Sequence, residues 1–197
     1  MPKVSDAQRE ARRDEIIRAA MRAIAEKGLS RVSMADIVTA AGLSVGAVYG
    51  HFEGKQDLLS VVAHHVLGRR RDEIDALLRD GTPPAPGEVL VLLLSGMLRD
   101  GATPGALIQI WAEATVDPHI RATVLGAVAI LERAFTRALT AWFDAHPEQA
   151  PDGTEDGVRR LLPIMISLAQ GFVVQSAILP EFDGDTYLKT VRSLLPH

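Results

Sequence analysis

Residues 33–52 read Ser-Met-Ala-Asp-Ile-Val-Thr-Ala-Ala-Gly-Leu-Ser-Val-Gly-Ala-Val-Tyr-Gly-His-Phe, and the order of these residues predicts two short helices joined by a tight turn. Ser33, with Asp36 three positions later, has the pattern of a capping box, so a helix is predicted to begin there. Gly42 can adopt the left-handed conformation that ends a helix at low cost. Ser44 then begins a second helix after a turn of about three residues, which is the connection length of a helix-turn-helix.

The second helix, roughly residues 45–52, is too short to persist without packing from elsewhere. Val48 and Phe52, four positions apart, can face that core. The other residues form a predicted surface with little bulk: Ser44, Val45, Gly46, Ala47, Tyr49 and His51. Such a surface fits the DNA major groove, which is about 12 Å wide. The donors of Tyr49, His51 and the nearby Lys55 suit phosphate oxygens, which position a protein without reading sequence.

A supporting helix is predicted upstream. Ser5 and Gln8 form another plausible capping box, and an apolar face recurs at helical spacing until Gly28. That face consists of Ile16, Ile17, Ala20 and Ile24. The outer side carries Arg9, Arg12, Arg13, Arg18 and Arg22.

The segment from Ser44 to Phe52, with Lys55 and the Leu58-Leu59 pair, resembles the DNA-binding signature of the tetracycline-repressor (TetR) family of bacterial transcription regulators. The resemblance covers about residues 10–60, and the rest of the chain matches only as a set of helices. It implies that the second helix enters the major groove and that Ser33, Tyr49, His51 and Lys55 touch phosphates. Gly54 departs from the family pattern, which often has Ser or Asn there, and should weaken the capping of the next helix.

Composition narrows the alternatives. The 197 residues include no cysteine, which excludes disulfides, thiol nucleophiles and Cys-ligated zinc. No basic-then-apolar leader opens the chain, so a soluble, cytoplasmic protein is expected. Residues 1–55 hold nine Lys and Arg against seven Asp and Glu, whereas the remainder holds twelve against eighteen. A mildly basic DNA-binding segment joined to an acidic domain predicts modest non-specific affinity for DNA.

Beyond Lys55 the sequence predicts only helices. Their expected ranges are 55–78, 88–98, one that begins at Thr103-Pro104, one from Asp117-Pro118 to about 145, one over 154–179 and a short terminal helix capped by Asp183 or Asp185. The predicted fold is therefore all-α. A three-helix DNA-binding domain with the helix-turn-helix occupies residues 1–55, and a helical ligand-binding and dimerisation domain occupies residues 56–197.

Residues 161–180 are nearly all apolar, but Pro163, Ser167, Gln170 and Gln175 interrupt them, which favours a buried helix over a membrane span. A helix apolar on most sides needs cover on most sides. Its own domain would cover one side and the same helix of a second copy the other. The resemblance implies the same arrangement, a homodimer through the last two long helices. Two-fold symmetry then predicts a palindromic operator in double-stranded DNA.

Helix bundles bind small molecules in apolar pockets with few polar groups. The candidate ligand-binding residues are Met97, Gln109, Trp111, Glu113, Phe135, Met165, Phe172 and Gln175. An inward-facing Glu113 would favour a cationic or donor-rich ligand, because a buried carboxylate needs a partner. The resulting hypothesis is a ligand-responsive repressor whose small-molecule effector changes the spacing of the two recognition helices.

Two other classes remain open. In an all-helical enzyme or small-molecule carrier, His64, His65, His119 and Glu113 would be the candidates for a metal or acid–base site. The sequence has no H-x-x-x-H spacing, Gly-rich phosphate loop or nucleophile elbow, so neither a cofactor nor a catalytic residue is predicted. Helix-turn-helix spacing also occurs in proteins that never bind DNA, and a non-DNA interaction protein is the third class.

Overall fold

The computed structural model describes residues 6–79, 81–99 and 103–197, although not the side chains of residues 6 and 61–67. The described residues form α-helices and one 3₁₀ turn, without strands, which confirms the all-α prediction. The helices are α1 (Asp6–Lys27), α2 (Met34–Ala41), α3 (Val45–Tyr49), α4 (Lys55–Arg79), α5 (Pro86–Arg99), α6 (Pro104–Ala114), α7 (Pro118–Ala145), α8 (Thr154–Ile178) and α9 (Gly184–Leu194), with the 3₁₀ turn η1 at Pro147–Gln149.

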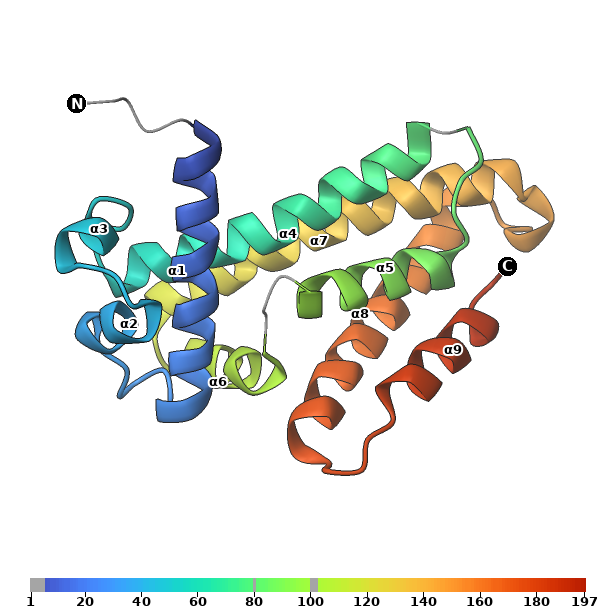
Figure 1. Ribbon diagram of the computed structural model, residues 1–197. Helices are drawn as coiled ribbons and strands as arrows, with labels where there is room; N and C mark the ends of the chain where they lie inside the picture. The colour runs from blue at the N-terminus through green and yellow to red at the C-terminus, as the bar shows by residue number, and fades with distance from the viewer. Residues whose placement is uncertain (1–5, 80, 100–102) are drawn as a thin grey trace.

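Helices α1, α2 and α3 gather at one end of the molecule, and α4 runs from them along α7 (Figure 1). Helix α6 packs beside α1, so the N-terminal helices contact the C-terminal ones directly. At the other end, α9 lies against α5 and α8. The molecule therefore has a small unit of three helices, α1 to α3, at one end of a larger helical bundle.

The predicted caps of the helix-turn-helix are present. Ser33 Oγ accepts from the Asp36 amide at 3.2 Å, and Asp36 Oδ2 accepts from the Ser33 amide at 2.9 Å, which completes the capping box. Gly42 ends α2 at φ 65°, in the left-handed region. Ser44 Oγ accepts from the Ala47 amide at 3.2 Å and so caps α3. Helix α3 itself ends at Tyr49, three residues earlier than predicted, and His51 and Phe52 lie in the turn that follows.

The later caps agree only in part. Asp117 accepts from two amides at the start of α7, and Asp183 caps α9. Thr103 precedes α6 but does not cap it; its hydroxyl instead donates to the Met21 carbonyl at 3.4 Å. Thr103 therefore connects the start of α6 to α1. The predicted cap at Ser5 lies outside the described residues.

A first buried cluster holds the N-terminal helices together. It contains the predicted core residues of α1, α3 and the following turn: Ile16, Ile17, Ala20, Ile24, Val48 and Phe52. It also contains Ala106 and Ala114 of α6 and Ile120 of α7. The domain boundary at residue 55 stays a prediction, and this cluster crosses it.

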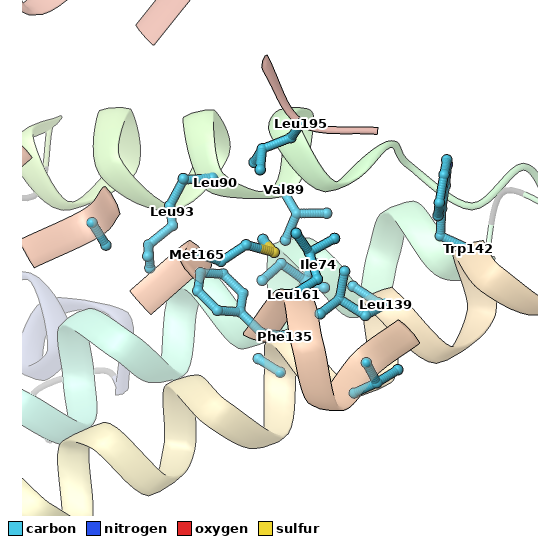
Figure 2. Close-up of a cluster of buried hydrophobic side chains, with 14 of the residues drawn as sticks. Ile74, Val89, Leu90, Leu93, Phe135, Leu139, Trp142, Leu161, Met165 and Leu195 are labelled. Carbon is cyan, nitrogen blue, oxygen red and sulfur yellow. The ribbon is translucent and has the colours of Figure 1, made fainter. Parts of the chain in front are cut away.

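A second buried cluster lies between α4, α5, α7, α8 and α9 (Figure 2). Phe135 and Met165 point toward each other in its middle, and both are fully buried. Trp142 lies at its edge, where its ring stacks on His146 at 4.6 Å between centroids. Close packing of this kind fixes how α7 and α8 sit against each other.

Helix α8 is long and apolar enough to cross a membrane by length and composition alone, a test that core helices of soluble proteins also pass. One side packs into the second cluster through Leu161, Met165 and Phe172. The opposite side carries a row of exposed or half-exposed residues at helical spacing, here called the α8 stripe: Ile164, Ser167, Gly171, Val174 and Ile178. Among the described residues, this face of α8 therefore stays largely exposed at Ile164, Val174 and Ile178.

Candidate DNA-binding surface and ligand cavity

Helix α3 presents the predicted surface to solvent. Val48 and Phe52 are buried in the first cluster. Val45 is 60% exposed and Tyr49 is 49% exposed, and no heavy atom would lie within 4 Å of a Cβ built on Gly46. The face that these residues form with Ser44 and Ala47 is therefore accessible, and its side chains are small enough for α3 to approach the floor of the DNA major groove.

Arginines of α1 lie beside this face. Burial, and then the charges of Arg9, Arg13 and Arg12, lower the pKa of the His51 ring. Both effects favour the neutral form of the His51 ring in the free protein. Arg9 and Arg12 are exposed, so their guanidinium groups add positive charge next to α3. These arginines were predicted to lie on the outer side of α1 but were not predicted as DNA contacts.

Lys55 has a structural role in addition to the expected phosphate contact. Its Nζ donates to the Leu29 carbonyl at 2.5 Å and to the Val32 carbonyl at 3.2 Å, which fixes the turn between α1 and α2. An ammonium has three N–H donors, and these two bonds use two of them. The predicted contact between Lys55 and a phosphate remains a prediction, and it would use the third N–H donor of the ammonium.

Ser33 is exposed at the start of α2, but its hydroxyl already donates to Asp36 Oδ2 at 2.8 Å. Lys27 donates to the other carboxylate oxygen at 2.6 Å. The Lys27 hydrogen bond, followed by those from Ser33, holds the pKa of Asp36 far below its usual range. The charge of Asp36 thus stays next to the predicted phosphate contact, balanced by Lys27.

A cavity of about 540 Å³ lies between the N-terminal helices and the C-terminal bundle. This volume falls within the range of about 300–1,000 Å³ typical of ligand pockets. Its described walls come from α1, α4, α5, α6, α7 and α8, namely Met21, Leu59, Leu93, Leu94, Met97, Leu107, Ile110, Trp111, Ile120, Thr123, Val124, Ala127, Val128, Leu131, Ile166, Ala169, Gln170, Val173 and Val174. None of these nineteen side chains is charged.

Two of the eight predicted ligand-binding residues, Met97 and Trp111, line this cavity. Three others lie outside the cavity in the second cluster: Phe135 and Met165 pack against each other between α7 and α8, and Phe172 packs on Phe182 and Tyr187 beside α9.

The three polar candidates also lie outside the cavity lining. Gln109 turns toward the N-terminal unit, where its Oε1 accepts from the Leu29 amide at 3.0 Å. Glu113 and Gln175 are half-buried and do not line the cavity. The expectation that an inward Glu113 selects a cationic ligand therefore has no support in the cavity lining.

The cavity lining also includes two polar residues that were not predicted from the sequence, Thr123 and Gln170. Gln170 was noted only as a polar break in an apolar run. Gln170 lies next to two buried residues of α8, Ala169 and Val173, so it marks the edge of the buried face. This position in the sequence does not reveal that a cavity lies beside it. Only the packing of α8 against α7 and α6 creates the cavity at this boundary.

The cavity and the DNA-binding surface share structural elements. Met21 of α1 and Leu59 of α4 belong to the first cluster and also line the cavity. Helix α6 contributes Ile110 and Trp111 to the cavity. The preceding residue of the same helix, Gln109, accepts a hydrogen bond from Leu29 in the turn between α1 and α2. A change of shape in the cavity would therefore reach α1 directly.

Within the described ranges, no three His, Cys, Asp or Glu side chains group as a metal site. His119 is exposed at the start of α7. The side chains of His64 and His65 lie outside the described ones.

The capped helix pair, the exposed low-bulk face of α3 and the arginines beside it define a helix-turn-helix DNA-binding protein. Residues 16–62 match the family model for bacterial regulatory proteins of the tetR family. Over 184 residues, the chain is 24% identical to the uncharacterised HTH-type transcriptional regulator Rv2912c of Mycobacterium tuberculosis, covering 92% of this chain and 90% of that protein. Residues 16–62 therefore carry the DNA-binding segment typical of TetR-family transcriptional regulators, and the similarity to Rv2912c extends along nearly the whole chain.

Solved structures share the fold along nearly the whole chain. The fatty acid degradation regulator FadR from Bacillus halodurans superposes with a TM-score of 0.68 at 19% identity and covers 93% of each chain. A transcriptional regulator from Saccharomonospora viridis, solved in complex with choline, superposes with a TM-score of 0.62 at 23% identity, covering 94% of this chain and 95% of that one. These likenesses extend the shared architecture to the C-terminal helices.

Proposed function

We propose that this protein is a ligand-responsive repressor, which binds a palindromic operator as a homodimer and leaves it when a small molecule occupies the cavity. The observation that carries the proposal is that Met21, on the helix that supports the DNA-binding surface, also lines the cavity. A ligand in contact with α1 can favour one orientation of that helix over another. Such a difference in affinity between two forms is what allosteric control requires.

The α8 stripe supports the homodimer. Ile164 is 50% exposed and Ile178 is 62% exposed, so a second copy of α8 could pack on these apolar side chains. The exposed residues of α9 are mainly polar, as in Asp185, Lys189 and Thr190, so α8 would supply the apolar centre and α9 the rim of the interface. The family resemblance implies a homodimer through the last two long helices, which are α7 and α8; this proposal keeps α8 and takes the short α9 in place of α7.

Two-fold pairing would give the dimer two α3 helices. Each would enter one half-site, and helix-turn-helix dimers bind half-sites about 34–36 Å apart or multiples of that spacing. An effector that pushes on Met21 or α6 would tilt α1 and, with it, α3. Both α3 helices could then no longer fit successive grooves.

The choline complex of the Saccharomonospora viridis regulator supports ligand binding within this architecture. The described cavity walls hold no carboxylate that could balance the charge of choline, so choline is not the ligand proposed for this chain. As a DNA-binding regulator, the protein would act in the bacterial cytoplasm, where the chromosome lies.

Selection of random duplex DNA by the full-length protein at moderate salt tests the DNA-binding part. We expect enrichment of one palindromic sequence, which would also supply the operator for effector screens. Enrichment of no sequence by a folded protein would contradict the proposal. An effector that binds the cavity but changes operator affinity by less than about 1 kcal/mol, the low end of typical coupling energies, would contradict the regulatory part.

Sedimentation of Ile164→Arg tests the dimer. This residue lies in the α8 stripe and does not line the cavity, so the substitution should yield a folded monomer with a ligand site. A dimer that survives unchanged would place the interface elsewhere.

A further inference from the structure

The chemistry of the cavity walls narrows the class of ligand. The inner walls include the fully buried side chains of Met21, Leu59 and Leu93, which are apolar. The polar side chains among the described walls are Thr123 and Gln170, together with the indole N–H of Trp111. A site of this kind offers extensive apolar contact and few hydrogen bonds.

A charged ligand would lose its hydration in this cavity without gaining an opposite charge. Burial of an ion without a partner is so costly that the group usually neutralises instead. Arg70 of α4 is the buried charged residue in the described part of the chain, at 3% exposure, but it does not line the cavity. Its guanidinium lies 2.8 Å from Glu73 Oε1 and packs against Gly96, so a carboxylate of the same chain already balances it.

Gln170 identifies the end of the cavity where a polar group would lie. It lines the cavity and is also exposed on α8, as is Val174 four residues later. These two residues therefore mark a mouth between the interior and solvent, at the edge of the α8 stripe, to which Val174 belongs. The Gln170 amide can both donate and accept a hydrogen bond, which suits a hydroxyl, carbonyl, ester or amide group.

We infer that the cavity binds an uncharged lipophilic molecule with a hydrogen-bonding group at one end, and that Gln170 holds this group at the mouth. The inference rests on the proposed function in so far as the cavity is the effector site. The apolar body of the ligand would lie against the inner walls, including Met21. Binding of the apolar body would thus act on α1, while the polar end would set the orientation.

Three probes of equal chain length test the charge preference: 1-decanol, decanoate and decyltrimethylammonium, each added to the full-length protein below its critical micelle concentration. Titration calorimetry gives the affinities, and Trp111 fluorescence locates the site. Trp142 is the other tryptophan of the chain and does not line the cavity, so the signal should disappear in Trp111→Phe. We expect decanol to bind at least about tenfold more tightly than either ion, equivalent to about 1.4 kcal/mol.

Variants of Gln170 test its role. Because the residue is exposed, Gln170→Leu and Gln170→Glu should both fold. Gln170→Leu should weaken decanol binding several-fold and leave the binding of decane unchanged. Gln170→Glu should increase the affinity for decyltrimethylammonium, because it adds a carboxylate at the mouth.

Equal or tighter binding of either ion by the unmodified protein would overturn the inference, as would failure of all three probes to bind. Operator selection separates this failure from failure of the proposed function. A protein that enriches a palindrome but binds no probe would retain its regulatory function and lose the proposed ligand class. If the protein binds decanol but enriches no DNA, the proposed ligand class would stand and the proposed regulatory function would be wrong.

Discussion

Helices α2 and α3 are capped by hydrogen bonds between residues three positions apart, whereas side chains from six helices wall the cavity. The DNA-binding surface therefore depends on a short contiguous segment, but the cavity depends on how distant segments pack. Substitutions on the exposed face of α3 should change DNA binding without changing the fold. Substitutions in the cavity should change ligand binding without changing the groove-facing residues, because no residue of α3 lines the cavity.

The largest expected effect is that of Val45→Arg. The new side chain would stand between α3 and the groove floor, and we expect at least about a 100-fold loss of operator affinity, or about 2.7 kcal/mol. Circular dichroism and the thermal midpoint should stay unchanged because Val45 is 60% exposed. Val116→Arg is the matched control, since Val116 is 74% exposed in the turn before α7 and does not belong to α3. Equal operator binding by both variants would refute the docking of α3.

Ala127→Phe should have the next largest effect. Ala127 lines the cavity, and the added ring would take the place of a ligand. We expect decanol binding to weaken about 30-fold, or about 2 kcal/mol, in line with the cost of overpacking. Operator affinity without ligand should be retained. Ala122→Phe, on an exposed position of the same helix, should bind decanol normally. Normal decanol binding by Ala127→Phe would show that the ligand lies elsewhere.

Gln109→Ala tests the connection between the two regions. The substitution removes the acceptor for the Leu29 amide, at a cost of about 1 kcal/mol in unfolding free energy. The effect of an effector on operator affinity should shrink by about fivefold, which corresponds to that energy. Gln109→Glu retains an acceptor oxygen and should restore the coupling. Unchanged coupling in Gln109→Ala would show that α6 does not transmit the signal through this bond.

The smallest expected effect concerns pH. The pKa of His51 lies below 6.5 in the free protein, and a nearby phosphate would raise it in the complex. Binding would then take up a proton, so operator affinity should rise as the pH falls from about 8 toward 6, and His51→Gln should reduce this rise. Because the folded-state pKa is lowered, stability is lost as the pH falls through 6.5, so folding must be followed in parallel. An identical pH profile in His51→Gln would remove His51 from the phosphate contacts.

The two regions also differ in how far the sequence predicts them. Ser33, Gly42 and Ser44 act through local backbone chemistry, so their roles and the start of α3 follow from the order of residues. The cavity does not, because Phe135 and Met97 are both apolar residues on predicted helices. Only the way α7 and α8 pack together puts Phe135 into the core, whereas Met97 faces the cavity. Lys55 is an intermediate case: its charge suggested a phosphate, but folding brings the Leu29 and Val32 carbonyls to its ammonium.

Helix α1 contributes to both regions, with Arg9 and Arg12 near α3 and Met21 in the cavity wall. In a genetic screen, this dual position has a clear consequence. Alleles that never derepress should map to the inner face of α1, at and around Met21, as well as to the C-terminal domain. Alleles that never repress should include the outer face of the same helix, at Arg9 and Arg12. The two faces of α1 would thus yield mutants with opposite phenotypes.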